Sequence, residues 1–203
     1  MGILNASTSF TRLMVAERVP GEFWQTVPGR LKQFAMRDID TSHDERAFGW
    51  VSFEDMLDPE WSVAPPDKGG YLVFSLRLDT RRIPPAVLKK HIALAQRDEM
   101  ARQREMGKSY ISRDRKVEIK EQVKLRLLGR FLPIPAEFNV VWNTQTQVIF
   151  FASTQAKMVD MFCEYFTRTF ELAPEPLTPY QLAATLLSEA ELDRLDEIDP
   201  TSF

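Results

Sequence analysis

The most concentrated charge in the sequence is a run of Lys and Arg between residues 89 and 130. This segment carries 13 basic and 6 acidic side chains, a net +7, whereas the rest of the chain carries a net −10. Within the segment, Lys116, Lys120 and Lys124 recur every four residues, a spacing that places them in one row on a helix. Lysines bind phosphate as point charges without reading bases. The pattern therefore predicts a surface that attracts a polyanion.

Eight basic side chains of the segment are the candidates for phosphate contact. They are Lys108, Arg113, Arg115, Lys116, Lys120, Lys124, Arg126 and Arg130. The other interpretation is a solvated amphipathic helix pair, partly neutralised by Glu118 and Glu121. Charge alone leaves both interpretations open.

A second group of residues has the composition of a metal-dependent nuclease site. Asp38, Asp40, Asp44 and Glu45 cluster around His43, and metal-assisted hydrolysis uses such clustered carboxylates. The same composition is typical of a polar loop between a helix and a strand, which is the interpretation we favour. We therefore expect no catalytic residues and no bound metal at this segment.

The cysteine and histidine content argues against other common chemistries. Cys163 is the only cysteine, and the chain has two histidines, which exclude a disulfide framework and a cysteine-rich zinc site. We expect Cys163 to be a buried small hydrophobe, since no histidine partner can be assigned to it. We predict no cofactor.

The elements that must position the basic residues follow from the periodicity of apolar residues. Alternation predicts strands over residues 9–15, 47–53, 71–78, 138–142 and 147–151, with another over 171–176. Helical spacing predicts helices over residues 21–36, 84–105, 113–128, 153–169 and 179–187. The mixture predicts an α+β fold, a mainly antiparallel sheet packed with helices. The basic helix pair, about residues 84–130, is expected to project from it.

Length and composition predict a single domain over residues 1–187, followed by an acidic, mobile tail over 188–203. The chain has 203 residues and a net charge of −3. No apolar run approaches the ~18 residues that a membrane span needs, and no signal peptide is recognisable. We expect a cytoplasmic protein with no membrane partner.

Three short motifs, in their order and spacing, carry a resemblance to a known family. The first is Phe48-Gly49-Trp50-Val51, and the second is the strand 72–78 followed by Arg82-Ile83-Pro84-Pro85-Ala86-Val87. The third is Lys120-Glu121-Gln122-Val123 followed by Leu127-Leu128-Gly129-Arg130. Together they resemble the bacterial recombination-associated RdgC family, although Gly129 stands where that family usually has proline.

The resemblance implies a non-enzymatic homodimer that binds duplex DNA, and also single strands, with little sequence preference. Such proteins associate with the nucleoid, coat DNA and restrain recombinase-driven strand exchange. Phe131 and Leu132, just after the basic helix, are candidates for an oligomer contact or an ordinary buried connection. Family members are typically longer and continue past Glu189–Leu192, so we expect this chain to be a C-terminally abbreviated member. The competing class is a protein-interaction module whose basic helices bind an acidic protein.

Overall fold

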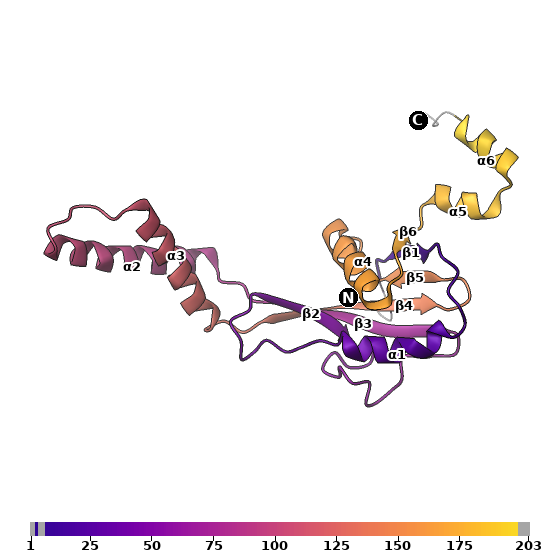
Figure 1. Cartoon of the computed structure of the whole chain (residues 1–203), viewed down its shortest axis with the longest axis horizontal. Helices are drawn as coiled ribbons and strands as arrows, with labels where there is room; N and C mark the ends of the chain where they lie inside the picture. The colour runs from indigo at the N-terminus through magenta and orange to yellow at the C-terminus, as the bar shows by residue number, and fades with distance from the viewer. Residues whose placement is uncertain (1–2, 4–6, 199–203) are drawn as a thin grey trace.

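The computed structural model of the chain describes residue 3 and residues 7–198, which form one sheet flanked by helices (Figure 1). Its strands are β1 (Thr11–Val15), β2 (Arg46–Val51), β3 (Tyr71–Thr80), β4 (Ile134–Asn143), β5 (Val148–Phe151) and β6 (Pro174–Pro176). Its helices are α1 (Phe23–Gln33), α2 (Pro85–Glu105), α3 (Arg113–Leu128), α4 (Ala156–Phe170), α5 (Pro179–Leu186) and α6 (Glu189–Asp196). No helix within these residues is long and apolar enough to cross a membrane.

The six strands form a single sheet in the order β2-β3-β4-β5-β1-β6, and every neighbouring pair is antiparallel. The prediction of an α+β fold with an antiparallel sheet is therefore confirmed. The longest pairing joins β3 and β4, from Tyr71 opposite Asn143 to Thr80 opposite Ile134. This long ribbon carries the chain out to the basic helices.

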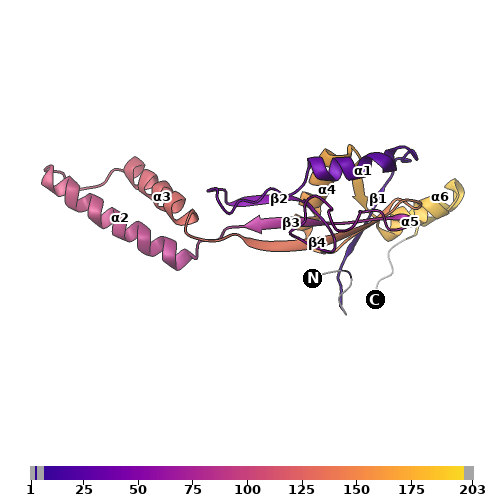
Figure 2. The ribbon, with the colours of Figure 1, turned by 90° about the horizontal axis from the view of Figure 1, so that it is seen from below.

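One face of the sheet is apolar, and α1 and α4 cover it (Figure 2). Alternate β3 residues point to this face, as the sequence predicts, and Phe74 and Leu76 are fully buried there. The Trp50 indole, also fully buried, donates a hydrogen bond of 2.9 Å to the Thr169 hydroxyl of α4. This contact joins β2 to α4 and satisfies a polar group that would otherwise destabilise the core.

Gly49 of the Gly-Trp-Val motif occupies a point where two backbone segments cross. The segment after α1 runs beside β2, and the Met36 amide donates to the Trp50 carbonyl at 2.9 Å. A Cβ atom on residue 49 would lie 2.4 Å from the Met36 Cα. Glycine is required here because any side chain would collide with backbone.

Helices α2 and α3, with the turn between them, form a projection that we call the arm, residues 85–128. Figures 1 and 2 show it extending from the end of the β3–β4 ribbon, which confirms the predicted projecting helix pair. Helix α2 begins with Pro85, a position where its missing N–H costs no hydrogen bond. Gly107, at φ 75°, ends α2, and the Ser112 hydroxyl caps α3 by accepting from the Arg115 amide at 3.3 Å.

Part of the predicted acidic tail is helical, and its mobility stays a prediction. Helix α6 begins after a capping box in which Ser188 and Glu191 satisfy each other's backbone amides. The two acidic residues of its first turn, Glu189 and Glu191, also suit the positive end of the helix dipole. Residues 199–203 of the predicted tail lie outside the described residues.

Candidate nucleic-acid interface

The arm is held together by an apolar seam between its two helices. Ile119, Val123 and Leu127 of α3 are 4%, 3% and 2% exposed, and Leu88 and Ile92 of α2 pack against them. The four-residue spacing of these three apolar residues places them on one side of α3. Because it faces α2, the adjacent rows of α3 are left on the outer surface of the arm.

A polar contact beside the seam uses one of the predicted phosphate-binding residues. Glu99 of α2 is 8% exposed and accepts from the Arg115 Nε at 3.1 Å and its terminal nitrogen at 3.2 Å. Arg115 also donates to Glu118 at 2.8 Å. These hydrogen bonds, with one from Gln103, hold the pKa of Glu99 below its ordinary value. Arg115 therefore joins the two helices, and its charge is already compensated.

The predicted lysine row divides into two free members and one paired member. Lys116 and Lys120 are exposed, and neither has an ion pair within the described part of the chain. The Lys124 ammonium lies 2.5 Å from the Glu45 carboxylate, in a contact where the side chains are 37% and 50% exposed. This hydrogen bond raises the pKa of Lys124. The outer end of the row is thus available for a ligand.

The remaining basic candidates also lie on the surface of the arm or just beyond it. All four are exposed and have no ion pair among residues 7–198; they are Lys108, Arg113, Arg126 and Arg130. Arg126 and Arg102 line a groove of about 280 Å³ between α2 and α3. The structure therefore places the predicted cations on the arm or, for Arg130, just beyond it, and two of them, Arg115 and Lys124, are already paired with carboxylates.

The two candidate oligomer residues have different surroundings. Phe131 is half-buried and packs against the apolar seam of the arm, whereas Leu132 is 79% exposed. Phe131 therefore serves as a connection in this chain, and Leu132 offers the larger apolar surface. Their role in an oligomer stays a prediction.

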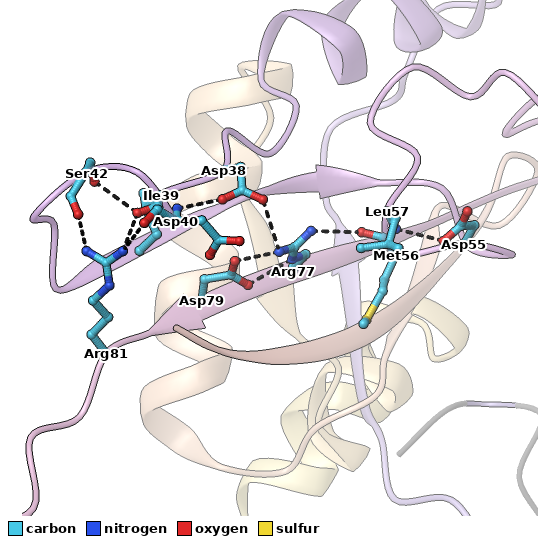
Figure 3. Close-up of polar contacts among 10 residues, drawn as sticks. All are labelled: Asp38, Ile39, Asp40, Ser42, Asp55, Met56, Leu57, Arg77, Asp79 and Arg81. Atoms are coloured by element: carbon cyan, nitrogen blue, oxygen red, sulfur yellow. Dashed lines mark hydrogen bonds and ion pairs between the residues drawn. The ribbon is translucent and has the colours of Figure 1, made fainter. Parts of the chain in front are cut away.

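The loop of residues 38–45 is organised by a buried arginine from β3's end (Figure 3). Arg81 is 5% exposed, and its guanidinium donates to the carbonyls of Ile39 at 2.6 Å and Asp40 at 2.8 Å. It also donates to the Ser42 carbonyl and, at 3.5 Å, to the Asp44 carbonyl. Backbone oxygens thus replace water around this cation, and they fix the loop's course.

The carboxylates of this loop are engaged in separate contacts, as Figure 3 shows in part. Asp38 accepts from the Asp40 amide at 2.6 Å and lies 4.0 Å from Arg77. Asp44 accepts from the Ser42 hydroxyl at 2.8 Å, and Glu45 pairs with Lys124. Among the described residues, no three His, Cys, Asp or Glu side chains are placed to hold a metal ion. The carboxylates of this loop thus have separate partners, and the absence of catalysis by the loop stays a prediction.

A family model described as "RdgC: Putative exonuclease, RdgC" matches residues 22–189 of the chain. The chain belongs to the RdgC family. The sequence resemblance is therefore confirmed, and membership gives the chain a DNA-associated, recombination-related role. No curated protein matches the chain. The family match contains the arm and all eight predicted basic residues.

In this RdgC-family chain, the loop of residues 38–45 also fixes the base of the arm. The Glu45–Lys124 pair joins the loop to α3, and a Cβ added at Gly129 would lie 3.2 Å from the His43 ring. The imidazole therefore packs against the residue that follows α3. These two contacts join the loop to the end of α3.

Sequence reasoning missed the ion pair beneath this RdgC-family loop. Arg77 binds Asp79 in a bidentate manner, with Nε at 2.8 Å from one carboxylate oxygen and a terminal nitrogen at 2.6 Å from the other. Asp79 is 1% exposed. The signal was available, since residues two apart in a strand share a face. The roles of Arg81 and Glu45 had no such signal, because their partners lie far away in the sequence.

Proposed function

We propose that this RdgC-family chain binds DNA through its arm without selecting a sequence. The observation that carries the proposal is the exposure of Lys116 and Lys120 on the outer surface of α3, where neither forms an ion pair with any described residue. Four residues of helix rise about 6 Å, and lysine carries its ammonium on a flexible four-carbon stem, so the two groups can reach separate phosphates.

The absence of sequence selection follows from the chemistry of these contacts. Lysine neutralises phosphate and releases condensed counterions, a gain that is the same for every sequence. Arg113, Arg126 and Arg130 add cations at the two ends of the same helix. Phosphate contacts of this kind allow the protein to bind duplex DNA and also single-stranded DNA.

The wider role that we propose is the coating of DNA by a homodimer. A protein that occupies the phosphate backbone over many sites denies a recombinase access to the same DNA, and so restrains strand exchange. We propose that the protein performs this role at the nucleoid, in the cytoplasm. The support comes from family membership together with the charge of the arm.

We also propose that the chain acts without catalysing DNA cleavage. The support is the state of the acidic loop, whose carboxylates contact Arg77, Ser42 and Lys124 rather than converging on one point. Incubation of the protein with duplex DNA and Mg²⁺ should leave the DNA intact. Cleavage that disappears in Asp38→Ala/Asp40→Ala would show that the loop is catalytic.

The test of DNA binding is the salt dependence of affinity for a labelled random-sequence duplex, measured by fluorescence anisotropy. Lys116→Gln/Lys120→Gln removes two proposed phosphate contacts and should make the slope of log K against log salt less steep by about 1.8. The matched control is Lys157→Gln/Arg194→Gln, which removes two exposed cations on α4 and α6. Its slope should remain that of the wild type.

Two outcomes would contradict the proposal. Equal slopes for the two double variants would mean that Lys116 and Lys120 do not contact DNA. Failure of the wild type to bind DNA at low salt would favour the other class, in which the arm binds an acidic protein. Unlabelled DNA of unrelated sequence separates the classes, since it competes only when DNA is the ligand.

A further inference from the structure

A second cationic surface lies outside the arm, in a pocket between the end of α1, β2 and α4. The pocket has a volume of about 680 Å³, within the range of small-molecule sites. Three arginines line it, Arg37 after α1, Arg46 at the start of β2 and Arg168 near the end of α4. We call it the arginine pocket, after these three residues.

The three guanidinium groups are not compensated by carboxylates. None of them has an ion pair within the described part of the chain, and the pocket is lined by one acidic residue, Asp44. The Asp44 carboxylate accepts from the Ser42 hydroxyl at 2.8 Å. The side chains that line the pocket therefore carry an excess of two positive charges, which favours the binding of an anion.

Aromatic residues line one side of the pocket, and one of them contacts Arg168. The Arg168 guanidinium lies 5.9 Å from the centre of the Phe34 ring, a cation–π contact. The Tyr165 hydroxyl donates to the Phe34 carbonyl at 2.8 Å. Burial raises the pKa of Tyr165, and Arg168 and Arg37 are near enough to oppose that rise. Arg37 and Arg168, from distant parts of the chain, thus line one pocket with Tyr165.

The pocket is linked to the lysine row of the arm through the start of β2. Lys124, the inner member of the row, pairs with Glu45, and Arg46 is the next residue along the chain. Arg46 lies opposite Thr80, at the end of the sheet that leads into the arm. The pocket and the inner end of the lysine row are therefore both attached to the start of β2.

We propose that the arginine pocket binds a phosphate group. Guanidinium groups bind phosphate oxygens through paired N–H donors, and three of them around one pocket match a group with several charged oxygens. The phosphate can belong to the DNA backbone or to a small phosphate compound, which share this chemistry. The proposal goes beyond DNA binding by the arm, because the pocket can bind phosphate whether or not the arm binds DNA.

The test uses two probes, inorganic pyrophosphate measured by calorimetry and a labelled duplex measured by anisotropy. Arg46→Gln/Arg168→Gln should weaken binding of at least one probe by about tenfold or more, the change in Kd that one charge-assisted hydrogen bond represents. The control, Arg12→Gln/Arg18→Gln, removes two exposed arginines near β1 and should change neither affinity. Arg46→Gln alone gives the same comparison if the double variant folds poorly.

The pattern of losses identifies the source of the phosphate. Weaker binding of DNA assigns the pocket to the DNA backbone, and weaker binding of pyrophosphate alone assigns it to small phosphate compounds. Unchanged affinity for both probes overturns the proposal. Failure of DNA binding by the arm is distinguishable, since Lys116→Gln/Lys120→Gln should leave pyrophosphate binding intact.

Discussion

Replacing Glu45 by glutamine should strengthen DNA binding by freeing a lysine of the arm. In the structure the Glu45 carboxylate lies 2.5 Å from the Lys124 ammonium, beside the exposed Lys120. Glu45→Gln leaves Lys124 charged and free to contact phosphate. One added contact makes the slope of log K against log salt steeper by about 0.9, which corresponds to about eightfold tighter binding at 0.1 M salt.

The matched control for this variant is Glu54→Gln. Glu54 lies 2.8 Å from Lys68 in a pair with similar exposure, 38% and 40%, but away from the arm. Both variants raise the net charge by one and release one lysine from its ion pair, so a general effect of charge would appear in both. Anisotropy titrations of a random duplex at several salt concentrations compare them. A Glu45→Gln slope equal to that of Glu54→Gln would refute the reasoning that the lysine row contacts DNA.

Three further predictions concern the buried Arg77–Asp79 pair, the Glu99–Arg115 pair of the arm and the exposed Leu132. Arg77→Met should lower the free energy of unfolding in urea by about 3–5 kcal/mol, because it leaves the Asp79 carboxylate buried without its partner; Arg77→Met/Asp79→Val should recover most of that loss, and a double variant as unstable as the single would contradict this cause. Arg115 lowers the pKa of Glu99, so the pair stabilises the arm above the ordinary pKa of glutamate and ceases to do so as pH falls through the lowered value. Between pH 7 and pH 3, the melting temperature should therefore fall less in Glu99→Gln than in the wild type. Equal falls in melting temperature would exclude this contribution. Leu132→Asp should shift the mass measured by light scattering from dimer toward monomer, since Leu132 is 79% exposed, and an unchanged dimer mass would exclude it from the oligomer contact.

The parts of the fold that the sequence predicted are those with strong local periodicity. Alternation predicted the strand over 71–78, observed as β3 over Tyr71–Thr80, and helical spacing predicted the helix over 113–128, observed as α3. Both patterns depend on neighbours within a few residues. The helix in the acidic tail was not predicted, although a capping box at Ser188 and Glu191 begins it.

The parts that the sequence did not predict depend on contacts between distant segments. Glu45 pairs with Lys124, which lies 79 positions later in the sequence. Arg37 and Arg168 line the same pocket only because α4 packs beside α1. Arg115 has the same local pattern as its neighbours on α3, but Glu99 of the other helix decides that its charge is compensated. Charge counting locates a basic surface, and only the packing shows which of its cations are free.

The central claim, that the outer row of the arm contacts DNA, is tested most directly by lysine footprinting on the wild-type protein. Acetylation rates are read for each lysine by mass spectrometry, with and without a saturating random-sequence duplex. We predict that Lys116 and Lys120 become protected while Lys157, on α4, reacts at an unchanged rate. Equal rates for Lys116 and Lys120 in the two conditions would contradict the account.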